Sequence, residues 1–222
     1  MLIEGNNLSV AIDGREIVAD ESVRCAPGEM TALVGPSGSG KTTLLHALGL
    51  LLPVSRGHIL VDGKDVTSYD GGQRRRFWRD HAAFVLQDYG IVDDESVGFN
   101  VTMRGQRRAT NADARLSAAL EQTGLAGRAG ETASHLSGGE KQRLALARAI
   151  YRRASVLFVD EPTASLDARN RHTVIELFTG FARQGATVVV STHDEEMIAA
   201  CDSRHPMGMR EVQTVTTATG RR

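Results

Sequence analysis

The segment GPSGSGKT at Gly35–Thr42 matches the pattern G-x-x-x-x-G-K-[ST] at every fixed position. It follows the apolar run MTALV at Met30–Val34, which predicts a buried strand, and it precedes Thr42–Leu50, which predicts a helix. Glycines let the backbone curl so that successive N–H groups point at phosphate oxygens, and the helix directs the positive end of its dipole at the same charge. The strand, loop and helix together predict a phosphate-binding loop.

The residue types of this loop fit the phosphates of a nucleotide. Lys41 supplies a cation for the β- and γ-phosphates, and the Thr42 hydroxyl can ligate Mg²⁺. A chance glycine-rich turn is the alternative, but the flanking strand and helix argue against it. The motif by itself leaves open an ATPase, a GTPase or a kinase. The residues expected to contact the nucleotide are Gly35, Pro36, Ser37, Gly38, Ser39, Gly40, Lys41, Thr42 and Thr43.

A second chemical feature is the segment VLFVDE at Val156–Glu161, an apolar strand that ends in two acids. An aspartate at a strand end can hold Mg²⁺, usually through water, which we expect of Asp160. Adjacent carboxylates repel each other, so a structural reason for the second acid is harder to find. We expect Glu161 to polarise the attacking water. A solvated acidic turn is the alternative, and the phosphate loop makes it much weaker.

Apolar runs alternate with helical segments along the rest of the chain. Ala82–Leu86 and Thr187–Ser191 predict further buried strands, and Asn170–Arg183 predicts a helix. This alternation favours an α/β fold with a mainly parallel sheet that is covered on both faces. The phosphate loop makes a P-loop NTPase the expected architecture.

Two other parts surround this core. Leu8–Ile12 and His58–Val61 predict short strands of an N-terminal antiparallel β subdomain. Ala109–Thr123 and Gly139–Arg153 have helical patterns and fit best as an insertion into the sheet. We therefore expect a single domain over 1–222, with 1–88 and 156–222 as the core with its β subdomain and 89–155 as a helical subdomain.

The composition excludes several kinds of protein. Hydrophobic residues make up 41% and charged residues 24% of the 222 residues, and the formal net charge is −1. No overall basic field therefore points to nucleic acid as a partner. Cys25 and Cys201 lie far apart, which argues against a disulfide framework or a zinc site. The longest apolar run, Leu44–Val54, is too short to cross a membrane, so a pore would have to come from another chain.

The segment LSGGEKQR at Leu136–Arg143 places a serine and two glycines just before a long helical pattern. A helix start with bare N–H groups is a potential anion site. The alternative is a helix cap, in which Ser137 and Glu140 form a capping box. That alternative explains both residues, but it does not require two consecutive glycines.

LSGGEKQR resembles the signature motif of ABC ATPases, and the other motifs of that family follow in the expected order. Gln87 in FVLQDYG resembles the Q-loop, Ala164–Asp167 resembles the D-loop, and His193 in STHDEE resembles the switch histidine. The resemblance extends from about Leu2 to about Arg210. It implies a P-loop NTPase with a RecA-like core. It also implies that the chain binds and hydrolyses ATP with Mg²⁺ and powers export or extrusion through separate membrane subunits.

The resemblance also implies roles for individual residues. Two chains would meet head to tail as a homodimer, with each ATP between one phosphate loop and the other chain's signature. Ser137 and Gly139 are implied to contact the γ-phosphate in trans, and Gly138 is implied to bind the nucleotide beside them. Those implied to act in catalysis are Glu161, His193, Lys41 and Gln87, and those implied to hold the metal are Thr42, Gln87 and Asp160.

Several phrases are similar to one branch of the family, the small ATPases of lipoprotein-release and macrolide-export systems: LLHALGLLLPVSRG, DYGIVDDESV and DEPTASLDARN. Such subunits are cytoplasmic and peripheral on the inner face of the plasma membrane, where they work with a separate integral membrane permease. A non-transport role, in regulation or in mechanotransmission to cell-wall enzymes, is the alternative. Chromosome-structuring and DNA-repair members fit poorly, because no heptad pattern and no cysteine lies between Lys41 and Ser137.

The resemblance implies that Gln87–Val101 forms part of a groove that receives a short helix of the permease. Tyr89, Ile91 and Val92 are the apolar candidates. The run Arg74–Arg76 is more typical of a solvated face, and Trp78 is more typical of a core.

One position departs from the family pattern. The aromatic residue that stacks on adenine in the family falls at Ile12, which cannot stack but can give apolar contact. We therefore predict that Ile12→Tyr tightens ATP binding, because a ring adds stacking to burial. A binding titration of both proteins measures this, and an unchanged affinity contradicts it.

Overall fold

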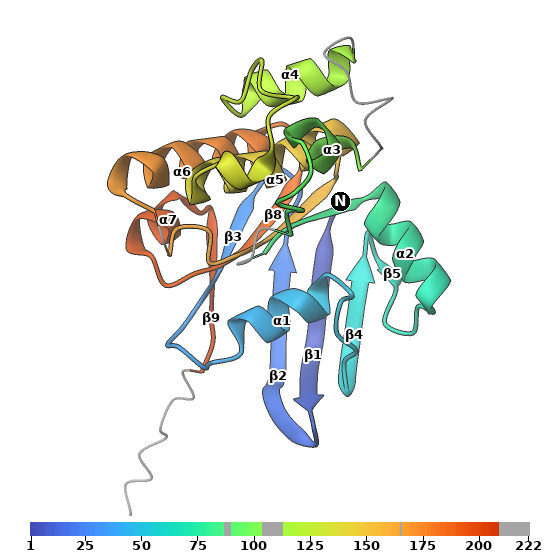
Figure 1. Ribbon diagram of the computed structural model, residues 1–222. Coiled ribbons are helices and arrows are strands. Elements are labelled where there is room, and N and C mark those ends of the chain that lie inside the picture. Colours follow the sequence, from blue (N-terminus) through green and yellow to red (C-terminus); the bar gives the residue numbers. More distant parts are fainter. Residues whose placement is uncertain (87–89, 104–112, 165, 209–222) are drawn as a thin grey trace, which may run out of the picture.

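The computed structural model describes residues 1–86, 90–103, 113–164 and 166–208. Within these ranges the strands form a parallel sheet and an antiparallel sheet, and most helices gather on one side of the parallel sheet (Figure 1). The architecture is that of a P-loop NTPase, as the sequence predicted. No helix in the described part of the chain is long and apolar enough to cross a membrane.

The parallel sheet has the strand order β6-β7-β8-β3-β9 among the described residues. Its strands are β3 (Met30–Val34), β6 (Ala82–Val85), β7 (Val156–Asp160), β8 (Thr187–Ser191) and β9 (Ser203–Pro206). β7 and β8 are buried at every position, because apolar elements cover both faces of the sheet. Side chains alternate between the two faces: Phe158 belongs to one apolar cluster, whereas Leu157 and Val159 belong to the other.

The antiparallel sheet has the order β2-β1-β4-β5 within the described ranges. It consists of β1 (Ile3–Ile12), β2 (Arg15–Cys25), β4 (Arg56–Val61) and β5 (Lys64–Asp65). Helix α1 (Lys41–Leu48) lies between this sheet and the parallel sheet, and Leu44 and Leu45 are fully buried there. The phosphate loop therefore leads into a helix that is fixed from both sides.

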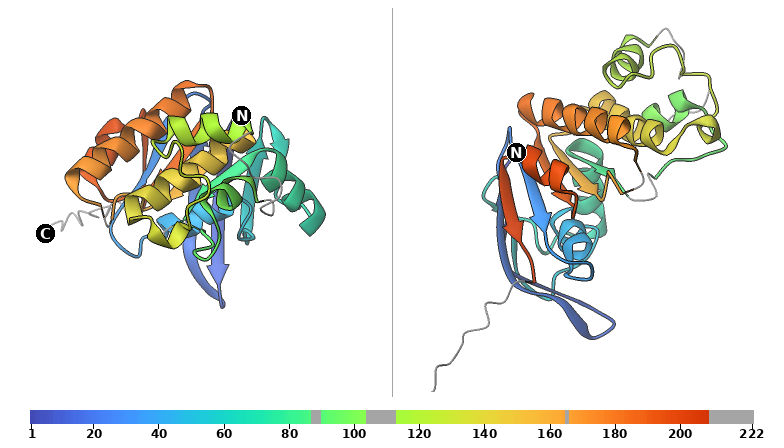
Figure 2. Two further views of the ribbon diagram at one scale, coloured as in Figure 1. Left: turned by 45° about the horizontal axis from the view of Figure 1, so that its top comes forward. Right: turned by 90° about the vertical axis from the view of Figure 1, so that its left-hand side faces the viewer.

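The helical part lies between β6 and β7 in the sequence. It contains α3 (Val97–Thr102), α4 (Ala114–Gln122), the 3₁₀ turn η1 (Ala133–His135) and α5 (Gly138–Arg152). These elements share an apolar cluster, and α4 stands far from the β1–β2 hairpin (Figure 2). Helix α5 contributes Leu144 to this cluster and Leu146 to the cluster on the sheet. Since α5 belongs to both, the division of the chain into 1–88, 89–155 and 156–222 remains a proposal.

Several elements differ from the sequence expectations. The strand expected at Leu8–Ile12 is the end of the longer β1, and α6 (Ala168–Arg183) begins two residues before the expected helix. The helix expected over Ala109–Thr123 is described only from Ala114, after the cap Asp113. Helices α2 (Gly71–Asp80) and α7 (Glu195–Ala200) and strand β9 were not predicted. α2 carries few apolar residues, and its one clear signal is the capping box of Asp70 with Gln73.

We predict that Phe158→Ala lowers the free energy of unfolding by about 3–5 kcal/mol, which is the usual cost of deleting a buried ring. Phe158 is fully buried, and its ring stacks on Phe84 with the centroids 5.2 Å apart. Urea denaturation measures the loss. Phe158→Leu is the matched control and should lose clearly less; equal losses would contradict a packing role for the ring.

Candidate functional site

The phosphate loop and the start of α1 form one side of a cavity of about 620 Å³. α1 starts after Gly40, whose φ of 91° lies in the left-handed region, and no side chain among the described residues caps this helix. The first N–H groups of a helix have no partner within it, so those of Lys41, Thr42 and Thr43 need an outside acceptor. The residues lining the cavity are Ile17, Gly35, Pro36, Ser37, Gly38, Gly40, Lys41, Thr42, Thr43, Glu161, Ala164 and His193.

The loop wraps closely around the Lys41 side chain. Its ammonium donates to the carbonyl of Gly35 at 2.9 Å and to that of Pro36 at 3.1 Å. Gly35 has no room for a side chain, because a Cβ would lie 2.6 Å from the Met207 carbonyl oxygen. The loop thus holds a buried cation against two of its own backbone carbonyls.

The acid at the end of β7 meets hydroxyl groups from two other elements. Asp160 accepts hydrogen bonds from the Thr42 hydroxyl at 2.9 Å and from the hydroxyl of Ser191, the last residue of β8. Asp160 is buried, and a buried carboxylate needs such donors. Ser191 was missed by the sequence reasoning, although its place at the end of the run TVVVS offered a signal, since parallel strands end at one edge of a sheet.

Glu161 and His193 lie together at the same edge. The His193 Nδ1 atom is 3.0 Å from the Glu161 carboxylate, and both side chains line the cavity. The same nitrogen also lies 3.0 Å from the second carboxylate oxygen of Glu161, so His193 contacts both oxygens. The φ angle of Glu161 is 44°, so a residue with a side chain occupies the region that favours glycine, and its N–H donates to the Ser191 carbonyl at 2.9 Å. This backbone strain directs the carboxylate toward the cavity.

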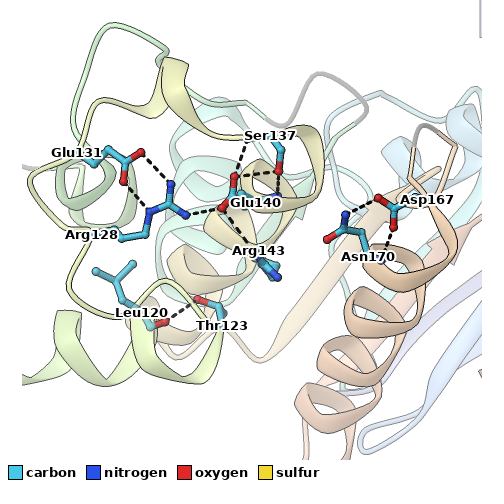
Figure 3. Close-up of polar contacts among 9 residues, drawn as sticks. All are labelled: Leu120, Thr123, Arg128, Glu131, Ser137, Glu140, Arg143, Asp167 and Asn170. Atoms are coloured by element: carbon cyan, nitrogen blue, oxygen red, sulfur yellow. Dashed lines mark hydrogen bonds and ion pairs between the residues drawn. The ribbon is translucent and has the colours of Figure 1, made fainter.

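The signature segment lies on a different element from the cavity. Ser137 caps α5 and forms the predicted capping box with Glu140: the Ser137 N–H donates to the Glu140 carboxylate at 2.8 Å, and the Ser137 hydroxyl accepts from the Glu140 N–H (Figure 3). The Ser137 N–H is the main reason that the pKa of Glu140 is lowered to about 2, and Arg128 adds to it. Ser137, Gly138 and Gly139 are not among the residues that line the cavity. A second copy could bring these groups to it.

The remaining candidates lie apart from these groups. Ile12 is 41% exposed near the tip of the β1–β2 hairpin and does not line the cavity, whereas Ile17 of β2 does. The side chain of Ser39 faces a neighbouring cavity of about 400 Å³ beside β2. Gln87 and Tyr89 lie outside the described residues.

The candidates for permease contact are spread over two environments. Val92 is 44% exposed, and Ile91 packs on the cluster of the helical part. Trp78 packs against the core between the sheets and donates its indole N–H to the Gly49 carbonyl at 2.8 Å. Its burial supports the interpretation as a core residue.

The residues present fit ATP and Mg²⁺. The cavity has the volume of an ordinary small-molecule site, and uncapped amides with a buried lysine suit a polyphosphate. The oxygens of Thr42 and Asp160 are hard donors of the type that Mg²⁺ prefers, so these two residues would hold the ion together with phosphate oxygens and water.

Comparison with known proteins gives consistent results. Residues 18–164 match the family model described as ABC transporter. The chain is 40% identical over 191 residues to the lipoprotein-releasing system ATP-binding protein LolD of Bordetella pertussis, covering 84% of this chain and 83% of that protein. It is 38% identical over 175 residues to the macrolide export ATP-binding/permease protein MacB of Marinobacter nauticus, covering 77% of this chain and 27% of that protein.

A solved structure agrees with these relatives. The dimeric post-hydrolysis state of the ATP-binding cassette MJ0796, bound to ADP and Pi, superposes with a TM-score of 0.80 at 25% identity. The match covers 92% of this chain and 94% of that one.

The strain at Glu161 can be tested by two substitutions that both remove its carboxylate. We predict that the Glu161→Gly variant is more stable than the Glu161→Ala variant by roughly 0.5–1 kcal/mol, because glycine adopts a positive φ without strain. The greater conformational entropy of glycine in the unfolded chain offsets part of this gain in stability. Urea denaturation without nucleotide compares them. An alanine variant of equal or higher stability contradicts the prediction.

Proposed function

The chain belongs to the ABC transporter family as an ATP-hydrolysing subunit, and we propose that it acts as a head-to-tail homodimer on a separate membrane permease. One observation carries the homodimer: the cavity and the signature turn of one chain lie on different elements, and Ser137, Gly138 and Gly139 do not line the cavity. A symmetric partner places its signature turn opposite the cavity, and the symmetry then completes two equivalent sites. The solved relative MJ0796 is a dimer with ADP and Pi.

Within one chain, we propose that the phosphate loop binds the triphosphate. The N–H groups of Lys41, Thr42 and Thr43 at the start of α1 donate to phosphate oxygens, and the Lys41 ammonium neutralises the β- and γ-phosphates. Thr42 and Asp160 would hold Mg²⁺, which supplies charge neutralisation on the phosphates when bound. The Gln87 side chain, proposed as a further metal contact, lies outside the described residues.

For hydrolysis, we propose that Glu161 orients a water molecule and accepts its proton as the water oxygen attacks the γ-phosphorus. The bond from the γ-phosphorus to the bridging oxygen breaks, which gives ADP and inorganic phosphate. The position of the Glu161 carboxylate supports this role, because it lines the cavity beside the phosphate loop and its one side-chain partner among the described residues is His193. His193, 3.0 Å from the Glu161 carboxylate, fixes its orientation and lies where it can reach the γ-phosphate.

The names of two relatives support the proposed permease partner and location. LolD is named as the ATP-binding protein of a lipoprotein-releasing system, and MacB is named as a combined ATP-binding and permease protein. The chain covers 83% of LolD and 27% of MacB, so it corresponds to the ATP-binding portion. We propose that it docks on the inner face of the plasma membrane through its permease. A regulatory or mechanotransmitting role is not favoured.

We predict that Glu161→Gln keeps ATP, accumulates as an ATP-bound dimer and loses phosphate release by at least about a hundredfold, the usual loss on removing a general base. Phosphate release and sedimentation velocity with ATP measure the two effects. Lys41→Ala is the control and should stay monomeric, because it loses its nucleotide. Undiminished phosphate release by Glu161→Gln contradicts the role of Glu161, and a strictly monomeric ATP-loaded form contradicts the dimer.

A further inference from the structure

Behind the signature turn, charged side chains alternate in sign from the loop after α4 to the first turns of α5. In order they are Glu131, Arg128, Glu140 and Arg143 (Figure 3). Arg128 lies between two carboxylates, and its side chain is 30% exposed. None of these residues lines the nucleotide cavity of the same chain.

The guanidinium group of Arg128 contacts Glu131 with one edge and Glu140 with another nitrogen. Its Nε and Nη2 atoms donate to the two carboxylate oxygens of Glu131 at 2.6 and 2.8 Å. This paired contact fixes the plane of the guanidinium group and aims Nη1 at Oε1 of Glu140. The position of Arg128 is therefore set independently of Glu140.

The two oxygens of Glu140 have different partners. Oε1 accepts from Arg128, whereas Oε2 accepts from the Ser137 N–H at 2.8 Å and from the Ser137 hydroxyl at 2.9 Å. Arg128 thus keeps Oε1 occupied and leaves Oε2 facing the signature serine. Arg143 lies 3.9 Å from Oε1, which is beyond hydrogen-bond distance.

The negative charge of Glu140 would repel an anion bound at the start of α5. Its carboxylate caps α5 well, but the same negative charge lies in the first turn of the helix that would receive a phosphate. Like charges at a desolvated interface disfavour binding unless a cation compensates them. Arg128 is the cation in direct contact with Glu140.

We propose that Arg128 is a positioning residue for trans binding of ATP. Arg128 compensates the charge of Glu140 and holds its carboxylate in the capping geometry that orders the signature turn. This inference rests on the proposed dimer. It adds a residue that touches neither nucleotide nor metal and acts only through Glu140.

A purely structural role is the competing explanation, and the backbone bears on it. The loop that carries Arg128 is also tied by main-chain hydrogen bonds, from the Gly98 N–H to the Ala129 carbonyl and from the Val97 N–H to the Glu131 carbonyl, both at 2.8 Å. These bonds do not involve the guanidinium group. Removal of the side chain should therefore leave the loop in place.

The experiment uses the full chain with Glu161→Gln, in which hydrolysis is blocked, and adds Arg128→Met. ATP binding to the monomer should be unchanged, because the phosphate loop acts in cis. The dissociation constant of the ATP-bound dimer should rise about tenfold or more, since in each of two symmetric sites Glu140 loses its hydrogen-bonded cation and keeps only Arg143, 3.9 Å away. Sedimentation velocity over a range of chain concentrations at saturating ATP measures it. Arg79→Met is the matched control and should dimerise like the background. Arg79 belongs to α2, and its carbonyl accepts from Arg152, which lies at the end of α5 opposite the signature turn.

A second substitution separates charge compensation from structural support. Glutamine at position 140 can still form the capping box but carries no charge. The combined variant Arg128→Met with Glu140→Gln should therefore recover most of the dimer affinity. If the combined variant is as weak as Arg128→Met alone, or if Arg128→Met dimerises like the background, the inference is overturned while the dimer stands. If the Glu161→Gln background itself stays monomeric with ATP, the dimer is overturned and the role of Arg128 with it.

Discussion

The first N–H groups of a helix have no partner within it, and at α1 no side chain among the described residues supplies one. The rest of the site follows from this constraint. β3 delivers the chain to the loop, Gly35 permits the close approach to Met207, and the two sheets hold α1 between them. A rigid helix with unpaired donors at its start creates a site that an anion satisfies without rearrangement of the fold.

The register of the parallel sheet brings the remaining chemistry to the same place. Asp160 at the end of β7 pairs with Ser191 at the end of β8, and Leu33 of β3 pairs with Ser191 from the other side. Because all three strands run in one direction, their last residues meet at the edge where α1 begins. The hydroxyl groups of Thr42 and Ser191 then satisfy the buried Asp160 carboxylate, and Glu161 follows directly at the edge.

The elements that the sequence predicted best are those that the sheet buries on both faces. Met30–Val34 and Thr187–Ser191 have the predicted bounds, because a fully buried strand is a continuous apolar run. α2 escaped prediction because glycines and arginines dominate it, and its stability comes from its cap and from the packing of Phe77 and Trp78. Motif residues were located by spacing, and the strand-end position of Ser191 would have located that residue too, whereas Ile17 reaches the site through tertiary contacts that spacing does not encode.

The N-termini of α1 and α5 differ in their capping, and the difference fits the proposed roles of α1 in binding ATP in cis and of α5 in binding it in trans. α1 has no side-chain cap among the described residues, so a nucleotide would supply partners that the fold lacks. α5 has a complete capping box, with Ser137 and Glu140 satisfying each other, so its start is stable alone. A phosphate that approaches α5 must compete with Glu140 for the Ser137 hydroxyl, which already donates to that carboxylate. Binding at α1 should therefore be the tighter step and closure onto α5 the reversible one, which is the order that a cycle of association and release requires.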